Sequence, residues 1–245
     1  MNYQKNFHES SGVLAVDCKV INICGEKYCI FLAFDINIGL INCFFRIGNE
    51  DSFGYKKFLK QLINEGYVIK AIVSDGGTGI FSTVRALSIK IHQRCHIHLL
   101  RDLKTGLKIS PKRMKLNIRK YYIYKYAKLL LDSKTEEQKE LRLKHFYRVV
   151  DIMYQTNNPV EANTTKLFIR NLKAAFMFME YDYLDIPRTT NIIEGYISRL
   201  NARLKTTRGL KNPANAELII NGINYFLNEE YVKIRKHKSH KKVNS

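Results

Sequence analysis

Three strand-like segments near the start of the chain are separated by only a few residues, and this spacing constrains the fold more than any other feature. The segments are Gly12–Ile23, Tyr28–Phe34 and Leu40–Ile47, with turn residues at Gly25 and Gly39 between them. Connections this short join antiparallel neighbours, because a parallel pair needs a crossover of a dozen or more residues. The sequence therefore predicts an antiparallel meander at the start of the chain.

Helices and strands alternate after the meander. Asp51 can cap a helix, and strands are predicted at Val68–Val73 and Leu87–Gln93, followed by a helix at Cys95–Leu107. The apolar face of the helix capped by Asp51 is predicted to be Phe53, Phe58, Leu59, Leu62 and Ile63. A meander combined with helical crossovers predicts an α/β fold with a mixed five-stranded sheet flanked by helices.

The segment Pro111–Asp185 is helical in pattern, rich in tyrosine and without strand signals, so we expect an all-helical insertion. A helix with apolar residues at Ile193, Ile197, Leu200 and Leu204 follows Pro187, and a last helix runs from Pro213 to about Tyr231. The basic residues from Lys233 onward are expected to be loose. The predicted organisation is the first part of the core at 1–110, the insertion at 111–186, returning helices at 187–232 and a basic tail at 233–245.

The chain carries 41 Lys and Arg against 22 Asp and Glu, a net charge of +19. Most of the excess falls in two blocks: residues 101–150 hold 15 basic and 5 acidic side chains, and residues 201–245 hold 10 and 3. Two basic surfaces that bind a polyanion explain this distribution. A soluble basic protein with a solvated surface remains the alternative.

Several classes of protein are not favoured. The longest apolar run, Tyr28–Phe34, has seven residues and is too short to span a bilayer. The five cysteines are an odd number in mostly strand-like surroundings, which favours reduced thiols in an intracellular protein, cytoplasmic in a bacterium and nuclear in a eukaryote. No glycine-rich loop ending in Gly-Lys-Ser or Gly-Lys-Thr occurs, so no nucleotide cofactor is implied.

Two aspartates occupy positions that suit metal binding. Asp17 interrupts a strand, where Asp is disfavoured and an unpaired buried carboxylate is costly, so we expect a metal ligand, with pairing to Lys19 as the alternative. Asp75 follows a strand and precedes two glycines, which is also ordinary turn chemistry. Ligands gather at such strand ends in α/β sheets.

Glu194 is the third candidate, on a helix for which Asn191 is the expected cap. Cationic side chains surround it, as a site that cleaves phosphate esters requires. Three carboxylates can hold two Mg²⁺ ions, with Mn²⁺ as a substitute. The residues predicted to bind DNA are Arg199, Arg203, Lys205, Arg208, Lys112, Arg113 and Lys115.

Four stretches, in this order, resemble the DDE transposases, and more specifically their Mutator-like branch. They are Leu14–Asp17, Val73–Gly76, Gln93–His98 and Thr189–Gly195. The resemblance covers nearly the whole chain and implies a ribonuclease H-like core with a helical insertion before the last catalytic helix. It also implies catalysis by Asp17, Asp75 and Glu194 on double-stranded DNA, at transposon ends and target, by a homo-oligomer.

The chain differs from the family pattern at its start. Family members usually carry a DNA-binding region before the first catalytic Asp, and only sixteen residues precede Asp17. We therefore expect poor recognition of element ends, as in a truncated copy. Another nuclease of the same core, such as a resolvase or a hydrolase of RNA–DNA hybrids, and an inactive DNA-binding remnant of a transposase remain alternatives.

Cys95 and His98 match the Cys-x-x-His pattern of the same family. With His92 and His96 they suggest zinc, but seven contiguous residues that pass from a strand into a helix would have difficulty surrounding one ion tetrahedrally. We expect a structural role for Cys95 and His98.

Overall fold

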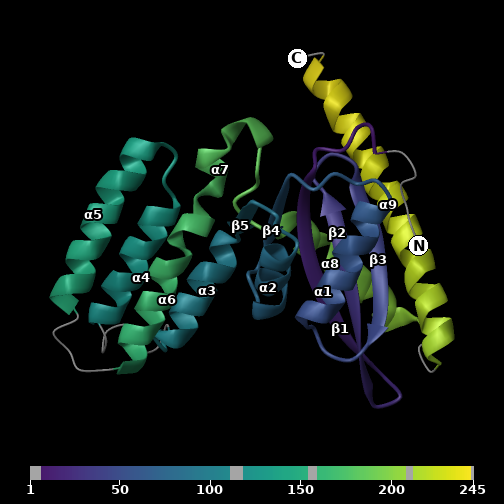
Figure 1. Cartoon of the computed structure of the whole chain (residues 1–245), viewed down its shortest axis with the longest axis horizontal. Helices are drawn as coiled ribbons and strands as arrows, with labels where there is room; N and C mark the ends of the chain where they lie inside the picture. The colour runs from purple at the N-terminus through teal and green to yellow at the C-terminus, as the bar shows by residue number, and fades with distance from the viewer. Residues whose placement is uncertain (1–6, 111–117, 154–158, 208–211, 244–245) are drawn as a thin grey trace. The chain divides into compact units, whose positions relative to one another are not determined.

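The computed structural model describes residues 7–110, 118–153, 159–207 and 212–243 (Figure 1). The chain divides into two compact units. The sheet unit comprises Met1–His92 and Thr190–Ser245, and the helical unit comprises Gln93–Thr189.

A five-stranded sheet forms the centre of the sheet unit, in the order β3-β2-β1-β4-β5. β1 pairs antiparallel with β2, β2 pairs antiparallel with β3, and β1 pairs parallel with β4. The strands are β1 (Val13–Ile23), β2 (Glu26–Asp35), β3 (Gly39–Ile47), β4 (Ala71–Ser74) and β5 (Ile91–Arg94). The meander and the mixed sheet are confirmed, and the strand order is that of a ribonuclease H-like fold.

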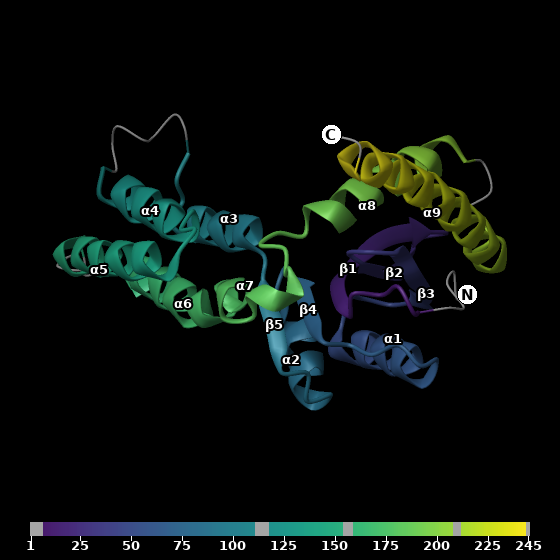
Figure 2. The same ribbon diagram turned by 90° about the horizontal axis from the view of Figure 1, so that it is seen from above.

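Helices cover both faces of this sheet, as Figure 2 shows. Strand residues alternate between the faces: Leu14 and Val16 pack with α1 (Ser52–Asn64) and α2 (Thr78–Ala86). Ala15 packs instead with α8 (Asn191–Thr206) and α9 (Pro213–Val243). The two faces therefore have separate apolar cores, and β1 contributes to both.

The predicted bounds of β4 and β5 were wrong at their starts. β4 begins at Ala71 rather than Val68, whose side chain is exposed. β5 begins at Ile91 rather than Leu87, because Leu87 still donates its N–H to the carbonyl of Thr83 at the end of α2. Ser88 then takes a left-handed φ of 54°, which turns the chain before the strand can start.

The cap of α1 is confirmed, whereas its apolar face is partly wrong. Asp51 Oδ1 accepts the N–H of Gly54 at 2.7 Å. Phe53 and Ile63, predicted for the buried face, are exposed, and Tyr55 is buried instead. Phe53 instead lies beneath the guanidinium of Arg46, 5.1 Å from its ring centroid.

α9 packs against β3, which lies at one edge of the sheet. Asn228 Oδ1 accepts the N–H of Leu40 at 2.9 Å, and its Nδ2 donates to the Leu40 carbonyl at 3.1 Å. A side chain at position 39 would meet Asn228 at 2.7 Å, so only Gly39 permits this approach. The amide of Asn228 thus satisfies both backbone groups of Leu40.

The expected end of the last helix was also wrong. α9 continues to Val243, beyond Tyr231 and through the segment predicted to be loose. That segment contains neither glycine nor proline, so no residue in it breaks the helix.

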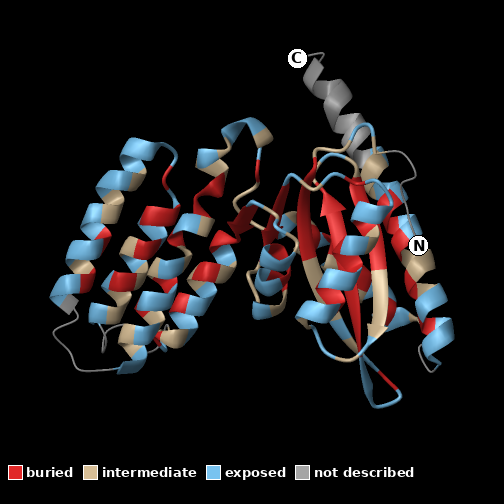
Figure 3. Cartoon of the chain, in the orientation of Figure 1, coloured by how far each residue is buried: buried red, intermediate tan, exposed pale blue. Residues whose placement is uncertain are grey.

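The helical unit contains no strand in its described residues apart from Gln93 and Arg94 at the end of β5. α3 packs against α4 and α6, and α4 packs against α5. The faces turned toward one another bury an apolar core that includes Leu103, Phe146 and Phe168 (Figure 3). The helices are α3 (His96–Gly106), α4 (Ile118–Leu131), α5 (Glu136–Met153), α6 (Pro159–Ala175), α7 (Met177–Glu180) and the 3₁₀ turn η2 (Asp182–Leu184).

None of the helices in the described residues has the length and apolarity that a membrane span requires.

Candidate active site

Asp17 and Asp75 come from neighbouring parallel strands. The last residues in register between β1 and β4 are Ala15 and Val73. Continuing this register by two residues places Asp17 opposite Asp75, just beyond the end of β4. Neighbouring strands lie about 4.8 Å apart, so the two aspartates belong to one small region of the sheet unit. Both side chains are half-buried.

The face of the sheet that Asp17 occupies follows from the same alternation. Ala15 packs with Ile193 and Tyr196 of α8. Asp17 lies two residues further along β1 and therefore on the face that α8 covers. α8 also packs against β1, and Glu194 follows Ile193 directly in its first turn.

Hydrogen bonds fix the turn that carries Asp75. Asp75 Oδ1 accepts the N–H of Gly77 at 2.9 Å, and the hydroxyl of Ser74 accepts the N–H of Gly76 at 3.1 Å. Gly76 has a φ of +75°, a conformation that suits glycine. The Ser74 hydroxyl also hydrogen-bonds Nε2 of His92, a buried side chain, at 2.8 Å. The backbone next to Asp75 is thus held from two neighbouring strands, β4 and β5.

Glu194 is held differently from the prediction. Asn191 is the first residue of α8, and the cap position belongs to Thr190. The buried hydroxyl of Thr190 donates to Glu194 Oε1 at 2.6 Å instead of capping the helix backbone. The prediction erred by one residue because Thr and Asn are both common at helix caps. Thr190 therefore directs the carboxylate of Glu194.

The three carboxylates suit a hard divalent cation, because Mg²⁺ prefers oxygen ligands. Asp17 also accepts a hydrogen bond, from the N–H of Cys18 at 2.7 Å. Within the described residues, the three groups do not bring one oxygen each within 4.8 Å of one another. They share a ligand type without surrounding one point.

Glu50 is a fourth carboxylate near this region, which the sequence did not reveal. A Cβ added at Gly77 would lie 3.5 Å from Asp75 Oδ1 and 3.8 Å from Glu50 Oε1, so both carboxylates face Gly77. Loss of solvent and the negative charge of Asp75 raise the pKa of Glu50, while a hydrogen bond from Tyr55 opposes the rise. Its place directly before the cap Asp51 gave no signal of this proximity. Glu50 adds negative potential beside Asp75.

The basic residues predicted on α8 lie along its middle and end. Arg199 is half-buried, with its guanidinium 6.0 Å from the ring centroid of Tyr196, and Lys205 is exposed. Arg203 is exposed and lies 3.9 Å from the carboxylate of Glu230 on α9. The predicted residues Arg208, Lys112, Arg113 and Lys115 lie outside the described residues.

Cys95 and His98 lie at the start of α3 in the helical unit. Cys95 is fully buried at the cap position, and His98 is half-buried. Cys95 Sγ and a ring nitrogen of His98 lie within 4.8 Å of each other. His96 does not join them, because its Nε2 bonds the carbonyl of Ala175 at 2.6 Å. Burial of the His96 ring lowers its pKa.

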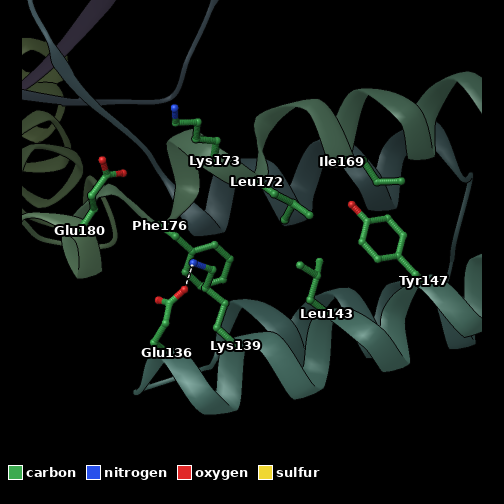
Figure 4. A pocket seen from close by; sticks show the side chains of 9 residues that line it. All are labelled: Glu136, Lys139, Leu143, Tyr147, Ile169, Leu172, Lys173, Phe176 and Glu180. Carbon is green, nitrogen blue, oxygen red and sulfur yellow. Dashed lines mark hydrogen bonds and ion pairs between the residues drawn. The ribbon is translucent and has the colours of Figure 1, made fainter.

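The helical unit also contains a pocket of about 560 Å³ between α5 and the α6–α7 segment. Its floor is apolar, and Lys139 forms an ion pair with Glu136 at its rim (Figure 4). None of the three predicted catalytic residues lines it. The lining residues are Glu136, Lys139, Leu143, Tyr147, Ile169, Leu172, Lys173, Phe176 and Glu180.

Residues 39–233, well over half of the chain, match the family model described as "Transposase, Mutator family". No curated protein matches the chain. The matched segment includes Asp75 and Glu194 and begins after Asp17.

Proposed function

The chain belongs to the Mutator family of transposases, and from this we propose that it cleaves DNA strands and transfers them, with Asp17, Asp75 and Glu194 as its catalytic residues. The observation that carries the proposal is the convergence of three elements: β1, the end of β4 and the first turn of α8 meet at one face of the sheet. Asp17, Asp75 and Glu194 are the carboxylates of these three segments. Carboxylates from three separate elements are what a metal-dependent phosphodiester site needs.

Asp17, Asp75 and Glu194 would hold two Mg²⁺ ions, for which Mn²⁺ can substitute. When bound, such a pair activates the attacking oxygen and stabilises the leaving oxygen of a phosphodiester. The hard oxygen ligands of this site fit that ion, whereas thiol and imidazole ligands would favour softer metals.

The protein's own contribution is to direct the ligand oxygens before DNA arrives. The hydroxyl of Thr190 occupies one oxygen of Glu194, and the N–H of Gly77 occupies one oxygen of Asp75. These hydrogen bonds orient both carboxylates. Ligands that are already oriented need little reorganisation when the substrate binds.

Cationic side chains on α8 are proposed to bind the DNA phosphates. The contact between Arg203 and Glu230 is long and exposed on both sides, and such surface pairs contribute about 0–1 kcal/mol. A phosphate group can therefore take the place of Glu230 at little cost. Arg199 and Lys205 extend the positive charge along the same helix. Binding as a homo-oligomer on transposon ends and target DNA belongs to the same proposal.

Nicking of a supercoiled plasmid in Mg²⁺ or Mn²⁺ tests the proposal. Glu194→Gln keeps the shape of the side chain and removes its charge, so cleavage should fall about 10³-fold, equivalent to about 4 kcal/mol in the barrier. DNA binding should be kept or strengthened. Glu217→Gln, at an exposed site on α9, is the matched control and should cleave normally.

Two results would contradict the assignment. Cleavage by the Glu194→Gln variant at the rate of the Glu217→Gln control would remove Glu194 from the site. Absence of metal-dependent nicking in the unmodified chain would favour a DNA-binding protein without catalysis. Joining of labelled DNA ends, measured in parallel, separates strand transfer from hydrolysis alone.

A further inference from the structure

Positive charge in the helical unit is concentrated on α3 and α4. α4 contains four basic residues and no acidic one, whereas α5 contains four of each. Figure 2 shows α3 and α4 as one layer of the bundle, with α5 and α6 as the other. The layer of α3 and α4 holds six basic residues and one acidic residue, whereas the layer of α5 and α6 holds seven and five, so most of the excess charge belongs to the first layer.

On α3 the basic residues form a stripe directed away from the core. Leu99, Leu103 and Leu107 face inward and are buried. Arg101 and Lys104 are three residues apart on one side of α3, Lys108 follows just beyond the end of the helix, and all three are exposed. The stripe lies on the side opposite to the buried leucines.

α4 continues this surface. Its inward residues are Ile123, Ala127 and Leu130, and Lys125 and Lys128 lie on the opposite side, exposed. The ammonium of Lys125 lies 5.9 Å from the ring centroid of Tyr122, which is also exposed. Packed helices are separated by about 8–10 Å, so the side chains of α3 and α4 form two adjacent rows.

The cations of this surface are not balanced by carboxylates. Among the residues that the structure describes, no carboxylate pairs with Arg101, Lys104, Lys108, Lys125 or Lys128. Asp102, the acidic residue of α3, is bound to Arg94 at 2.7 Å. Lys120 on α4 differs from the others, because it is half-buried and bound to Glu161 at 2.7 Å.

We propose that the outward face of α3 and α4, formed by Arg101, Lys104, Lys125 and Lys128 with Lys108 just beyond α3, binds the phosphate backbone of duplex DNA. The inference rests on the proposed function for its choice of polyanion. Duplex DNA presents one negative charge about every 1.7 Å along its axis, so two rows of cations meet phosphates in many registers. Such a surface binds without reading sequence. The helical unit thus binds DNA through residues outside the catalytic carboxylates.

Two triple variants of the full chain test this proposal. Lys104→Gln, Lys125→Gln and Lys128→Gln together remove three charges from the surface. The matched control, Lys144→Gln, Arg148→Gln and Lys166→Gln, removes three charges from exposed sites on α5 and α6. Affinity for a random duplex is measured from about 50 to 200 mM salt, and each lost phosphate contact should lower the log–log slope by about 0.9. Circular dichroism checks that both variants are folded.

We expect the surface variant to lose about two units or more of slope, because at least two phosphate contacts disappear, and the control to keep the original slope within about half a unit. Equal losses in the two variants, or no loss in either, would overturn the proposal. Competition by anionic vesicles that equals competition by duplex DNA at matched charge would also overturn it, in favour of a membrane surface.

Nicking at saturating DNA distinguishes this proposal from the proposed function. The surface variant should cleave at the normal maximal rate once DNA is in excess, whereas Glu194→Gln should bind DNA and fail to cleave. A surface variant with a normal salt slope and normal cleavage removes this inference alone. Normal cleavage by Glu194→Gln would contradict the catalytic assignment and would not affect the proposed DNA-binding surface.

Discussion

The sheet unit and the helical unit differ in how firmly the charged groups of their proposed sites are held. In the sheet unit, Asp75 and Glu194 accept short hydrogen bonds from Gly77 and Thr190. In the helical unit, the lysines of the outward face of α3 and α4 are exposed and no described carboxylate pairs with them. This difference suits the proposed roles, because a catalytic group needs a fixed direction, whereas a group that binds a polyanion needs only charge near the surface.

Asp35 is the extreme case of a fixed group in the sheet unit. It is fully buried at the end of β2 and accepts six hydrogen bonds. The donors come from three segments: Ser11 and Gly12 before β1, Asn37 and Ile38 in the next turn, and Tyr67 after α1. Asp35 therefore connects the start of β1 to the turn after β2 and to the segment after α1.

The largest loss of stability in this comparison of the two units should come from Asp35→Asn. The variant places an NH₂ group among donors, so we expect the free energy of unfolding to fall by about 3 kcal/mol. Tyr67→Phe removes one donor and should cost about 1 kcal/mol. Lys144→Gln in the helical unit should stay within about 0.5 kcal/mol. Urea unfolding measures all three, and an Asp35→Asn value as small as that of Lys144→Gln would break the contrast.

A smaller effect should follow from Thr190→Val, which keeps the shape of a buried side chain and removes the hydroxyl that directs Glu194. Cleavage should slow about tenfold, equivalent to about 1.4 kcal/mol, and half-maximal rate should need more Mg²⁺. Thr190→Ser keeps the hydroxyl and should restore both values. Equal impairment of the Val and Ser variants, or an unchanged Mg²⁺ requirement in Thr190→Val, would show that Thr190 serves only packing.

The smallest effect should come from Cys95→Ala, at the start of α3. Truncation of this buried thiol should lower the free energy of unfolding by about 1 kcal/mol without any change in bound zinc. Thermal unfolding and metal analysis of the purified chain provide the two measurements. One tightly bound zinc per chain, lost in the variant, would give Cys95 a metal-binding role instead of a structural one.

The architecture of the sheet unit was predictable because its signals are local. Alternating apolar residues identify a strand, and short turns between strands fix antiparallel neighbours. The same patterns assigned Asp17, Asp75 and Glu194 to their elements. Their catalytic role stays a prediction.

Other features depend on contacts that no local pattern encodes. No residue pattern around Asp35 predicts that it accepts six hydrogen bonds from three segments. No pattern around Glu50 predicts that it lies near Asp75. The cap of α8 was assigned to Asn191 because its neighbour Thr190 has a similar preference for that position. The start of β5 was predicted too early because serine has no preference for the left-handed conformation that Ser88 adopts, so no residue pattern indicated the turn there.

The hydrogen bonds between Asn228 and Leu40 have a consequence for how the protein is made. They join residues 188 positions apart. Because synthesis proceeds from the N-terminus, the backbone of β3 at Leu40 lacks these hydrogen bonds until α9 has been made. The helical unit, by contrast, is one continuous segment and can fold while the ribosome is still adding α8 and α9. Until then the apolar side of the meander formed by Ile30, Leu32 and Phe34 has no cover. Nascent chains should therefore depend on chaperones at this stage, because uncovered strands aggregate.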